Sequence, residues 1–393
     1  MKKLAIITTH PIQYNAPLFR LLTERKQIDI KVFYTWSQTA NGEKFDPGFG
    51  QNIAWDIPLL EGYEYSFVEN ISTSPGSHHY KGINNPTLIK QLEEWGANAQ
   101  LVYGWNFKSH WSVIRFFNKK IPVYFRGDST LIDENIGLKQ FVRKIVLKYV
   151  YSKIYKAFYA GVANKAYFKM MGLNEQQLIF LPHAVENDRF APVEENVHAG
   201  QKLRKSLDIP EDALVFLFAG KLEPKKQPDF LIENFVALKR DNAYLIMAGS
   251  GELEKSLLNT YASNSFIKFI GFQNQHQMPA VYHSSDVFVL PSKGPNETWG
   301  LAINEAMAAG KAIIASDKCG ASYDLIVNNK NGFVFESDNT DSLKTKLAFF
   351  VNNLTGAKLM GAASTEMIKQ FSFLQDCDAI ENSLNQLKKE SER

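Results

Sequence analysis

The chain has 393 residues, of which 45% are hydrophobic and 22% charged, and its formal net charge is +3. This length exceeds what one ordinary hydrophobic core covers and fits two domains of about 150 to 200 residues each. The small net charge excludes a surface that is basic throughout, so no nucleic-acid partner is expected.

Cysteine usage and hydropathy favour a cytoplasmic protein. The two cysteines, Cys319 and Cys377, lie far apart without C-x-x-C spacing, which predicts neither a disulfide framework nor a structural zinc site. No apolar run is long enough to predict a helix that spans a membrane.

The first residues predict the start of a doubly wound α/β domain. An apolar run at residues 3–8 is too short for a signal peptide and predicts a buried strand. A loop containing His10 follows, then a helix near residues 17–24 and a strand at 28–34. The first turn lacks the G-x-G-x-x-G fingerprint, which disfavours an enzyme that uses a nicotinamide or flavin.

The next part of the chain predicts loops and then later strands of the same sheet. Residues 36–80 are rich in glycine, asparagine, serine and aromatic residues and predict long loops that face a cleft. Strands predicted at residues 101–103 and 123–125 follow, and the second leads to Asp128. His10 and Asp128 are therefore expected at strand ends, where α/β domains place functional side chains.

A basic region spans residues 138–169, inside a stretch from 135 to 174 without acidic residues. Its apolar residues recur at roughly helical spacing and predict an amphipathic helix. Such a helix can lie on an anionic membrane surface, or it can pack on the domain with its lysines in water, and both remain open. The apolar residues are Leu138, Phe141, Val142, Ile145, Tyr149 and Ile154, and the basic ones are Lys139, Arg143, Lys144, Lys148, Lys153, Lys156, Lys165 and Lys169.

The middle of the chain predicts the boundary between two domains. Two strands, at residues 158–162 and 178–182, precede the segment H-A-V-E-N-D-R-F at 183–190. The polar stretch that follows, residues 191–204, predicts the hinge. The expected domains are residues 1–200 and 201–375.

The second domain opens with a candidate phosphate clamp. A strand predicted at residues 214–218 runs into A-G-K-L-E-P-K-K, where the ammonium groups of Lys221 and Lys226 can neutralise a diphosphate. The alternative is an exposed lysine cluster. A strand at 244–247 leads to a glycine turn that lets a nucleotide approach the backbone closely. The glycines of these two turns are Gly220, Gly249 and Gly251.

Residues 291–316 read PSKGPNETWGLAINEAMAAGKAIIAS and lie between two short apolar runs. They predict a loop and a helix, capped by Asn296 or Thr298 and ended by Gly310 in a left-handed turn. Helical spacing places Glu305 on the apolar side that faces the sheet, where a carboxylate needs partners.

Two glutamates flank the start of this helix. Glu297 precedes the first turn and lies roughly 12 Å from Glu305 at 1.5 Å per residue. Backbone N–H groups between them predict an anion site, so the order of groups matches the sugar, diphosphate and ribose of a nucleotide-sugar. The alternative is a capping carboxylate and a solvated helix face. The nucleotide-binding residues expected here are Thr298, Trp299, Gly300, Leu301 and Glu305.

The spacing E-x7-E, in the setting E-T-W-G-L-A-I-N-E-A-M-A-A-G-K-A-I-I-A-S, closely resembles the signature of retaining glycosyltransferases of family 4, the glycosyl transferases group 1. Residues 183–190 resemble the family's linker motif. A-G-K-L-E-P-K-K resembles its G-R-L-x-x-x-K motif, with Lys221 where arginine is usual. Gly320, Asp324 and Asn331-Gly332-Phe333 resemble a later motif, with Asp324 in place of glutamate. The resemblance covers residues 205–375, and the first half matches only in layout.

The resemblance implies the α/β fold called GT-B, in which two Rossmann-like doubly wound domains face each other across a cleft. It implies a retaining glycosyltransferase that moves a hexose-type sugar from a nucleotide-sugar to a carbohydrate or lipid-linked acceptor, in the synthesis of cell-surface polysaccharide, lipopolysaccharide or glycolipid. The second domain would bind the donor and the first the acceptor. A last helix, residues 376–393, would pack back on the first domain, and neither a cofactor nor a metal is expected. The implied location is the cytoplasm, with peripheral contact to the inner face of the membrane.

The implied roles follow the motifs. Lys226 and Lys221 stabilise charge on the departing diphosphate, as the helix N-terminus also does. Glu305 accepts hydrogen bonds from the ribose, and Glu297 from the transferred sugar. His10 and Asp128 are the catalytic candidates of the first domain, and their roles stay open because a structural role, such as His10 bonded to backbone, fits as well.

The sequence also allows two alternatives, one for a metal site and one for the function. Asp376-Cys377-Asp378 matches the D-x-D metal motif of the other glycosyltransferase fold, but its place in the last helix predicts a surface face. A GT-B-shaped binding or scaffold subunit without catalysis is the alternative function, and the presence of Lys226, Glu297 and Glu305 counts against it.

Overall fold

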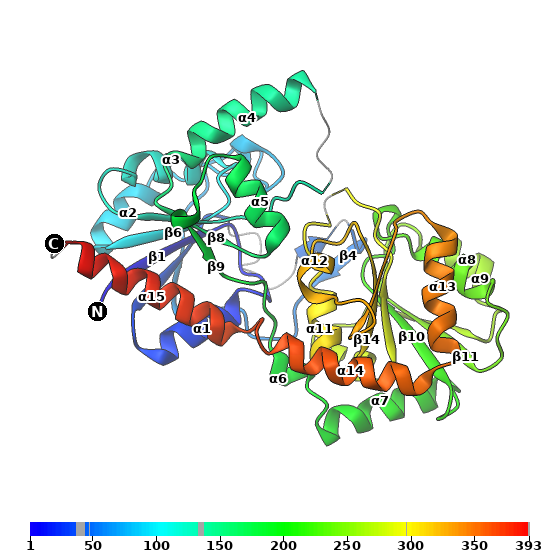
Figure 1. The fold of residues 1–393 in the computed structure, drawn as a ribbon. Helices are drawn as coiled ribbons and strands as arrows, with labels where there is room; N and C mark the ends of the chain where they lie inside the picture. The colour runs from blue at the N-terminus through cyan, green and yellow to red at the C-terminus, as the bar shows by residue number, and fades with distance from the viewer. Residues whose placement is uncertain (37–43, 47, 133–136, 296, 392–393) are drawn as a thin grey trace. The chain divides into compact units, whose positions relative to one another are not determined.

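The computed structural model describes the chain apart from residues 37–43, 47, 133–136, 296 and 392–393. The chain divides into two compact units (Figure 1). Unit 1 comprises Met1–Lys44, Pro58–Pro182 and Phe373–Arg393, and unit 2 comprises Phe45–Ile57 and His183–Ser372. Unit 2 thus begins its main part at His183, ahead of the expected boundary at residue 200.

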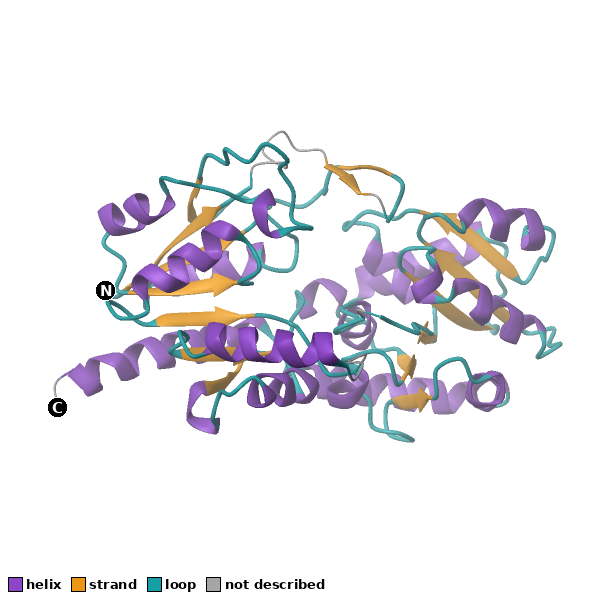
Figure 2. Cartoon of the chain, turned by 90° about the horizontal axis from the view of Figure 1, so that it is seen from above, coloured by secondary structure: helices purple, strands orange, loops and turns teal. Residues whose placement is uncertain are grey.

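Unit 1 is built on a seven-stranded sheet in the order β5-β2-β1-β6-β7-β8-β9, and every neighbouring pair is parallel. Most residues of its inner strands are buried, as expected for a parallel sheet with helices on both faces (Figure 2). The strands are β1 (Lys3–Thr8), β2 (Asp29–Tyr34), β5 (Glu64–Phe67), β6 (Ala99–Tyr103), β7 (Val123–Arg126), β8 (Lys156–Tyr159) and β9 (Leu178–Phe180).

The helices of unit 1 connect these strands, except for the last one, which arrives from the end of the chain. They are α1 (Ala16–Arg25), α2 (Leu88–Trp95), α3 (Lys108–Phe117), α4 (Leu138–Tyr151), α5 (Val162–Met170) and α15 (Phe373–Ser391), with short 3₁₀ turns η1 (Tyr80–Gly82) and η2 (Glu175–Gln177). Helix α15 packs on α1, where Arg25 bonds both carboxylate oxygens of Glu381 at 2.9 and 2.8 Å. The last helix therefore belongs to unit 1.

One aspartate of the D-x-D sequence is buried, although the sequence predicts that this sequence lies on the surface of the helix. Asp376 is only 2% exposed, while Asp378 is exposed and pairs with Arg25 at 2.6 Å. The prediction of a surface face is therefore wrong for Asp376 and right for Asp378. Burial raises the pKa of Asp376 to about 8, although the positive charge of Arg126 acts to lower this pKa. The carboxyl group is therefore protonated at neutral pH.

The buried Asp376 makes the stability of the protein depend on pH. In the unfolded chain Asp376 ionises above about pH 4, whereas in the folded protein it keeps its proton up to about pH 8. Unfolding therefore releases a proton in this window, and the free energy of unfolding should fall by up to about 5 kcal/mol from pH 4 to pH 8 and level off above. Asp376→Asn should remove most of that fall in urea unfolding measured across the window. An identical pH profile for the variant would show that Asp376 is ionised in the folded state.

Unit 2 is built on a six-stranded parallel sheet in the order β12-β11-β10-β13-β14-β15. Its strands are β10 (Leu214–Ala219), β11 (Ala243–Ala248), β12 (Ile267–Gly271), β13 (Val287–Leu290), β14 (Ala312–Ser316) and β15 (Gly332–Phe335). Its helices are α6 (Asn187–Phe190), α7 (Glu194–Ser206), η3 (Pro224–Lys226), α8 (Pro228–Val236), α9 (Glu254–Tyr261), α10 (Met278–His283), α11 (Ala302–Ala308), α12 (Ser322–Leu325), α13 (Thr340–Val351) and α14 (Leu354–Ile368).

Two segments differ from the sequence-based prediction. Residues 191–204, expected to be a hinge, mostly form helix α7, which packs on α10. Residues 36–80, expected to be loops, contain β5, a partly exposed edge strand too short and polar to show a periodic pattern. They also contain β3 (Lys44–Asp46) and β4 (Gln51–Ile53), which form a small two-stranded sheet of their own.

Candidate active site

The candidate site lies where the order of the strands in the sheet of unit 2 reverses. From β10 the chain proceeds outward to β11 and β12, whereas from β13 it proceeds the other way to β14 and β15. Strands β10 and β13 are neighbours, so their carboxyl ends form a topological switch point, where open α/β sheets bind ligands. The loop after β10 carries Lys221 and Lys226, and the loop after β13 carries Glu297.

These two loops meet through an ion pair between Lys226 and Glu297. Their side chains are only 16% and 9% exposed, so the pair is largely withdrawn from water. Ser292 donates a further hydrogen bond from its hydroxyl to Glu297 Oε2 at 3.1 Å, and the backbone of Lys293 donates to the carbonyl of Lys225 at 2.9 Å. The structure therefore brings together Lys226 and Glu297, two of the predicted site residues.

Glu305 lies on the buried side of α11, as the helical spacing predicts. It is 3% exposed, and its Oε2 accepts a hydrogen bond of 2.6 Å from the hydroxyl of Tyr282 on α10. Gly310 follows the helix with φ +71°, so the predicted left-handed turn is also confirmed. The predicted cap is wrong for Thr298, because Leu301 precedes the first turn and no side chain caps it; Asn296 lies outside the described residues.

The loop that leads into α11 is held by the segment that follows β14. The backbone N–H groups of Gly320 and Ala321 donate to the carbonyls of Glu297 at 3.1 Å and of Trp299 at 2.9 Å. A Cβ at position 320 would overlap the carbonyl of Thr298, so this close approach requires glycine. Gly300 adopts φ +101°, a backbone conformation that favours glycine. The predicted binding residues Thr298 to Leu301 thus form a fixed loop.

Trp299 ties this loop to the start of the main part of unit 2. Its Nε1 donates to Asn304 Oδ1 at 2.8 Å, and Asn304 Nδ2 donates to the carbonyl of His183 at 2.8 Å. The ring of Trp299 lies 5.3 Å from that of His183, centroid to centroid. Trp299 is 5% exposed, so its side chain supports the loop from inside.

The glycine turns after β10 and β11 pack directly on each other. The backbone N–H of Leu222 donates to the carbonyl of Ser250 at 2.9 Å, and that of Gly220 donates to the carbonyl of Ala248 at 3.0 Å. A Cβ at Gly249, where φ is +137°, would overlap the carbonyl of Gly220. These glycines therefore already serve the packing of the two turns.

Lys221 has a partner that the sequence does not indicate. Its Nζ lies 2.7 Å from Oδ1 of Asp46, a residue of the small β3-β4 sheet. Both lysines assigned to a diphosphate are thus paired with carboxylates: Lys226 with Glu297, and Lys221 with Asp46.

The two candidates of unit 1 lie at one edge of its sheet. His10 follows β1 and Asp128 follows β7, and these parallel strands are separated by β6. His10 Nδ1 lies 2.9 Å from the hydroxyl of Thr9, and its ring meets that of Trp36 edge-on at 5.5 Å. Asp128 is exposed. Both positions suit contact with a ligand at the carboxyl edge of the sheet.

Sequence reasoning missed four residues that contact the site residues. Tyr282 bonds Glu305, Ser292 bonds Glu297, Asn304 bonds Trp299, and Asp46 pairs with Lys221. Ser292 directly follows a buried strand, and that position could have indicated it. The other three carry no local signal.

Two parallel, doubly wound α/β units with this strand order define the GT-B class of fold. The solved structure of Anabaena HepE in complex with UDP superposes with a TM-score of 0.72 over 98% of this chain and all of that one, at 16% sequence identity. Residues 200–367 match the family described as glycosyl transferases group 1.

Two curated relatives are similar over parts of the chain. A UDP-Gal:alpha-D-GlcNAc-diphosphoundecaprenol alpha-1,3-galactosyltransferase of Escherichia coli is 26% identical over 54% of this chain and 55% of its own length. A lipopolysaccharide 1,2-N-acetylglucosaminetransferase of Salmonella typhimurium is 32% identical over 36% of this chain and 40% of its own length. The chain thus spans about half or less of these relatives. Among the described residues, no helix combines the length and hydropathy needed to cross a membrane.

Proposed function

We propose that the protein is a retaining glycosyltransferase that moves a hexose-type sugar from a nucleotide-sugar to a hydroxyl acceptor. The observation that carries the proposal is the buried Lys226–Glu297 pair at the switch point of unit 2, within the part of the chain that matches the glycosyltransferase family. The solved structure of HepE, which shares the fold, contains UDP.

In this proposal the two lysines of unit 2 bind the diphosphate. As the bond to the sugar breaks, negative charge builds up on the leaving phosphate, and Lys226 and Lys221 stabilise it. Low exposure of Lys226 strengthens this effect, because fewer water molecules screen its charge. The lysines supply the positive charge, so the proposed reaction needs no metal ion and no cofactor.

The two glutamates then recognise the sugars on either side of the diphosphate. Glu305 accepts hydrogen bonds from the ribose and Glu297 from the transferred sugar, as the family resemblance implies. Each carboxylate already accepts a hydrogen bond from a neighbouring hydroxyl group, that of Tyr282 for Glu305 and that of Ser292 for Glu297. These hydrogen bonds hold the carboxylates in place before the nucleotide-sugar binds. By the same resemblance the acceptor hydroxyl attacks on the face that the diphosphate leaves, and a phosphate oxygen takes its proton, so the anomeric configuration is retained.

A screen for donor turnover tests this proposal. The purified protein is incubated with UDP-, GDP-, ADP- and dTDP-sugars, and release of the nucleoside diphosphate is measured with and without a carbohydrate acceptor. We expect release of the nucleoside diphosphate from one class of nucleotide-sugar without added metal. The anomeric configuration of the sugar, α or β, should be the same in the product as in that nucleotide-sugar. Absence of release and of binding for the whole panel would contradict it.

We further propose that helix α4 places unit 1 on an anionic membrane surface, where a lipid-linked acceptor of polysaccharide, lipopolysaccharide or glycolipid synthesis would be found. Four apolar side chains of α4 are at least half exposed: Val142, Ile145, Val146 and Tyr149. Their spacing places them on one face of the helix, next to the exposed Arg143 and Lys148. Leu147, Val150 and Tyr151 form the buried face instead.

Binding to lipid vesicles distinguishes membrane docking by α4 from the alternative, in which the exposed side of α4 only faces water. Replacing Arg143, Lys144 and Lys148 by glutamine should weaken binding to phosphatidylglycerol-containing vesicles by at least about tenfold, since each basic residue near such a surface contributes about 1 kcal/mol. Replacing Ile145 and Val146 by serine should weaken binding as well, because the apolar face inserts. Lys369→Gln, which removes one exposed positive charge of unit 2 just after helix α14, serves as the control outside α4. Equal cosedimentation of all variants would contradict membrane docking.

A further inference from the structure

A short segment from the first part of the chain lies on the ligand-binding edge of unit 2. It consists of residues 45–57, apart from residue 47, and is called the strap below. Its described residues contact the loops after three adjacent strands, β10, β11 and β12. These loops form the carboxyl edge of the sheet, the edge at which such sheets bind nucleotides.

The first contact is ionic. Asp46 Oδ1 accepts a hydrogen bond of 2.7 Å from Lys221, and also accepts from the backbone N–H groups of Gly48 at 2.8 Å and Phe49 at 3.2 Å. Burial alone would raise the pKa of Asp46, but these three donors outweigh it and the pKa is lowered. Asp46 is therefore ionised at neutral pH and neutralises Lys221.

The second contact covers the glycine turn after β11. Ser250, which lies between Gly249 and Gly251, donates from its hydroxyl to the carbonyl of Phe49 at 3.2 Å. The ring of Phe49 packs edge-on against that of Phe272, after β12, with centroids 5.0 Å apart. Lys221 Nζ lies 5.0 Å from the centroid of the Phe49 ring.

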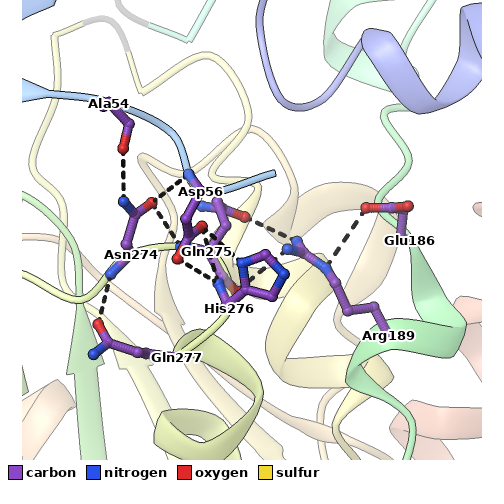
Figure 3. A network of polar contacts seen from close by, with 8 residues as sticks. All are labelled: Ala54, Asp56, Glu186, Arg189, Asn274, Gln275, His276 and Gln277. Atoms are coloured by element: carbon purple, nitrogen blue, oxygen red, sulfur yellow. Dashed lines mark hydrogen bonds and ion pairs between the residues drawn. The ribbon is translucent and has the colours of Figure 1, made fainter. Parts of the chain in front are cut away.

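The third contact fastens the other end of the strap, as Figure 3 shows. Asn274 Nδ2 donates to the carbonyl of Ala54 at 2.7 Å, and the backbone N–H of His276 lies 3.2 Å from both carboxylate oxygens of Asp56. The neighbouring Gln275 accepts from Arg189 at 2.8 Å, so this loop is itself held by α6.

We propose that the strap is an autoinhibitory cover of the nucleotide-sugar site: Asp46 holds Lys221 as a carboxylate stand-in for phosphate, and a donor diphosphate must displace it to bind. The inference rests on the proposed function, which assigns Lys221 to the diphosphate. A diphosphate that binds Lys221 while Asp46 stays in place would be repelled by the Asp46 carboxylate. The Asp46 and Lys221 side chains are 25% and 30% exposed, so their pairing is weak enough for a multiply charged diphosphate to reverse it.

Calorimetric titration with UDP, GDP, ADP and dTDP tests this cover. Asp46→Asn keeps an acceptor for the turn but removes the charge, and should tighten binding of the preferred diphosphate by about threefold to fivefold. Asp56→Ala frees the far end of the strap and leaves the contact with Lys221 in place. This variant should also bind the diphosphate more tightly. Glu61→Gln, an exposed carboxylate just beyond the strap, is the matched control and should leave the affinity unchanged.

Hydrogen exchange provides the second readout. Binding of the diphosphate to the unaltered protein should speed exchange of the amides of residues 48–57, because the strap leaves its contacts. Unchanged or weaker binding by Asp46→Asn, or slower exchange in the strap, would overturn the cover and make the strap part of the binding surface, while the proposed function would stand. No diphosphate binding by any variant would overturn the proposed function, and the cover with it.

Discussion

Lys226→Ala should lose transferase activity by about a hundredfold to a thousandfold, measured as release of nucleoside diphosphate from the preferred donor. Lys226 is the largely buried ammonium group at the switch point, and its loss leaves the departing diphosphate without that charge. The affinity for the nucleoside diphosphate should fall as well, because product and leaving group carry the same charge.

The same change should destabilise unit 2, and a control must separate the two effects. The Glu297 carboxylate would remain buried without its partner. Breaking a buried ion pair in this way lowers the free energy of unfolding by about 3–5 kcal/mol. The double variant with Lys226→Met and Glu297→Gln removes both charges and should recover most of that stability in urea unfolding without recovering activity. Recovery of activity in the double variant would contradict a role for either charge in the reaction.

Glu297→Ala should lose about a hundredfold in donor turnover but, unlike Lys226→Ala, should not weaken nucleotide binding. In the proposal Glu297 contacts the transferred sugar and not the diphosphate, so UDP or its counterpart should bind as tightly as before, or more tightly once the repelling carboxylate is gone. Titration with the diphosphate and turnover of the donor measure the two effects separately.

Asp376→Asn serves as the control for Glu297→Ala, because Asp376 is also a buried carboxyl but lies on α15 in unit 1. It should leave donor turnover at neutral pH nearly unchanged, since its carboxyl is protonated there. A Glu297→Ala variant with the turnover of the unaltered protein, or with diphosphate binding weakened as much as in Lys226→Ala, would reject the role given to Glu297.

The part of the site that follows from sequence is the part built from local periodicity and turn chemistry. Glu305 is predicted to face the sheet because the residues around it recur at helical spacing, and Gly310 is predicted to end the helix because only glycine adopts its backbone angles readily. Both predictions depend on residues within a few turns of each other. The parallel sheets likewise follow from continuous apolar runs.

What sequence does not predict depends on contacts between distant residues. Asp46 and Lys221 are 175 residues apart, and nothing in the glycine-rich segment around Asp46 indicates that it lies on unit 2. The burial of Asp376 depends on the packing of α15 within unit 1, whereas its helical position alone fits a wet face.

The sequence of helix α7 contains features typical of a helix, although its polar composition favours a hinge. Its polar composition suggested a hinge, yet Glu194 and Glu195 in its first turn and Arg204 and Lys205 in its last turn complement the helix dipole. Arg204 also bonds Asp286 at 2.7 Å, a contact that anchors the helix to unit 2.

Binding of the diphosphate by the two lysines is tested by comparing a nucleoside diphosphate with its nucleoside as ligands of the unaltered protein and of a variant with Lys221→Met and Lys226→Met. We expect the diphosphate to bind the unaltered protein and to lose at least about a hundredfold in affinity in the variant, while the weak binding of the nucleoside stays the same. Equal affinity of the two proteins for the diphosphate would contradict the assignment of these lysines to the pyrophosphate of an activated sugar.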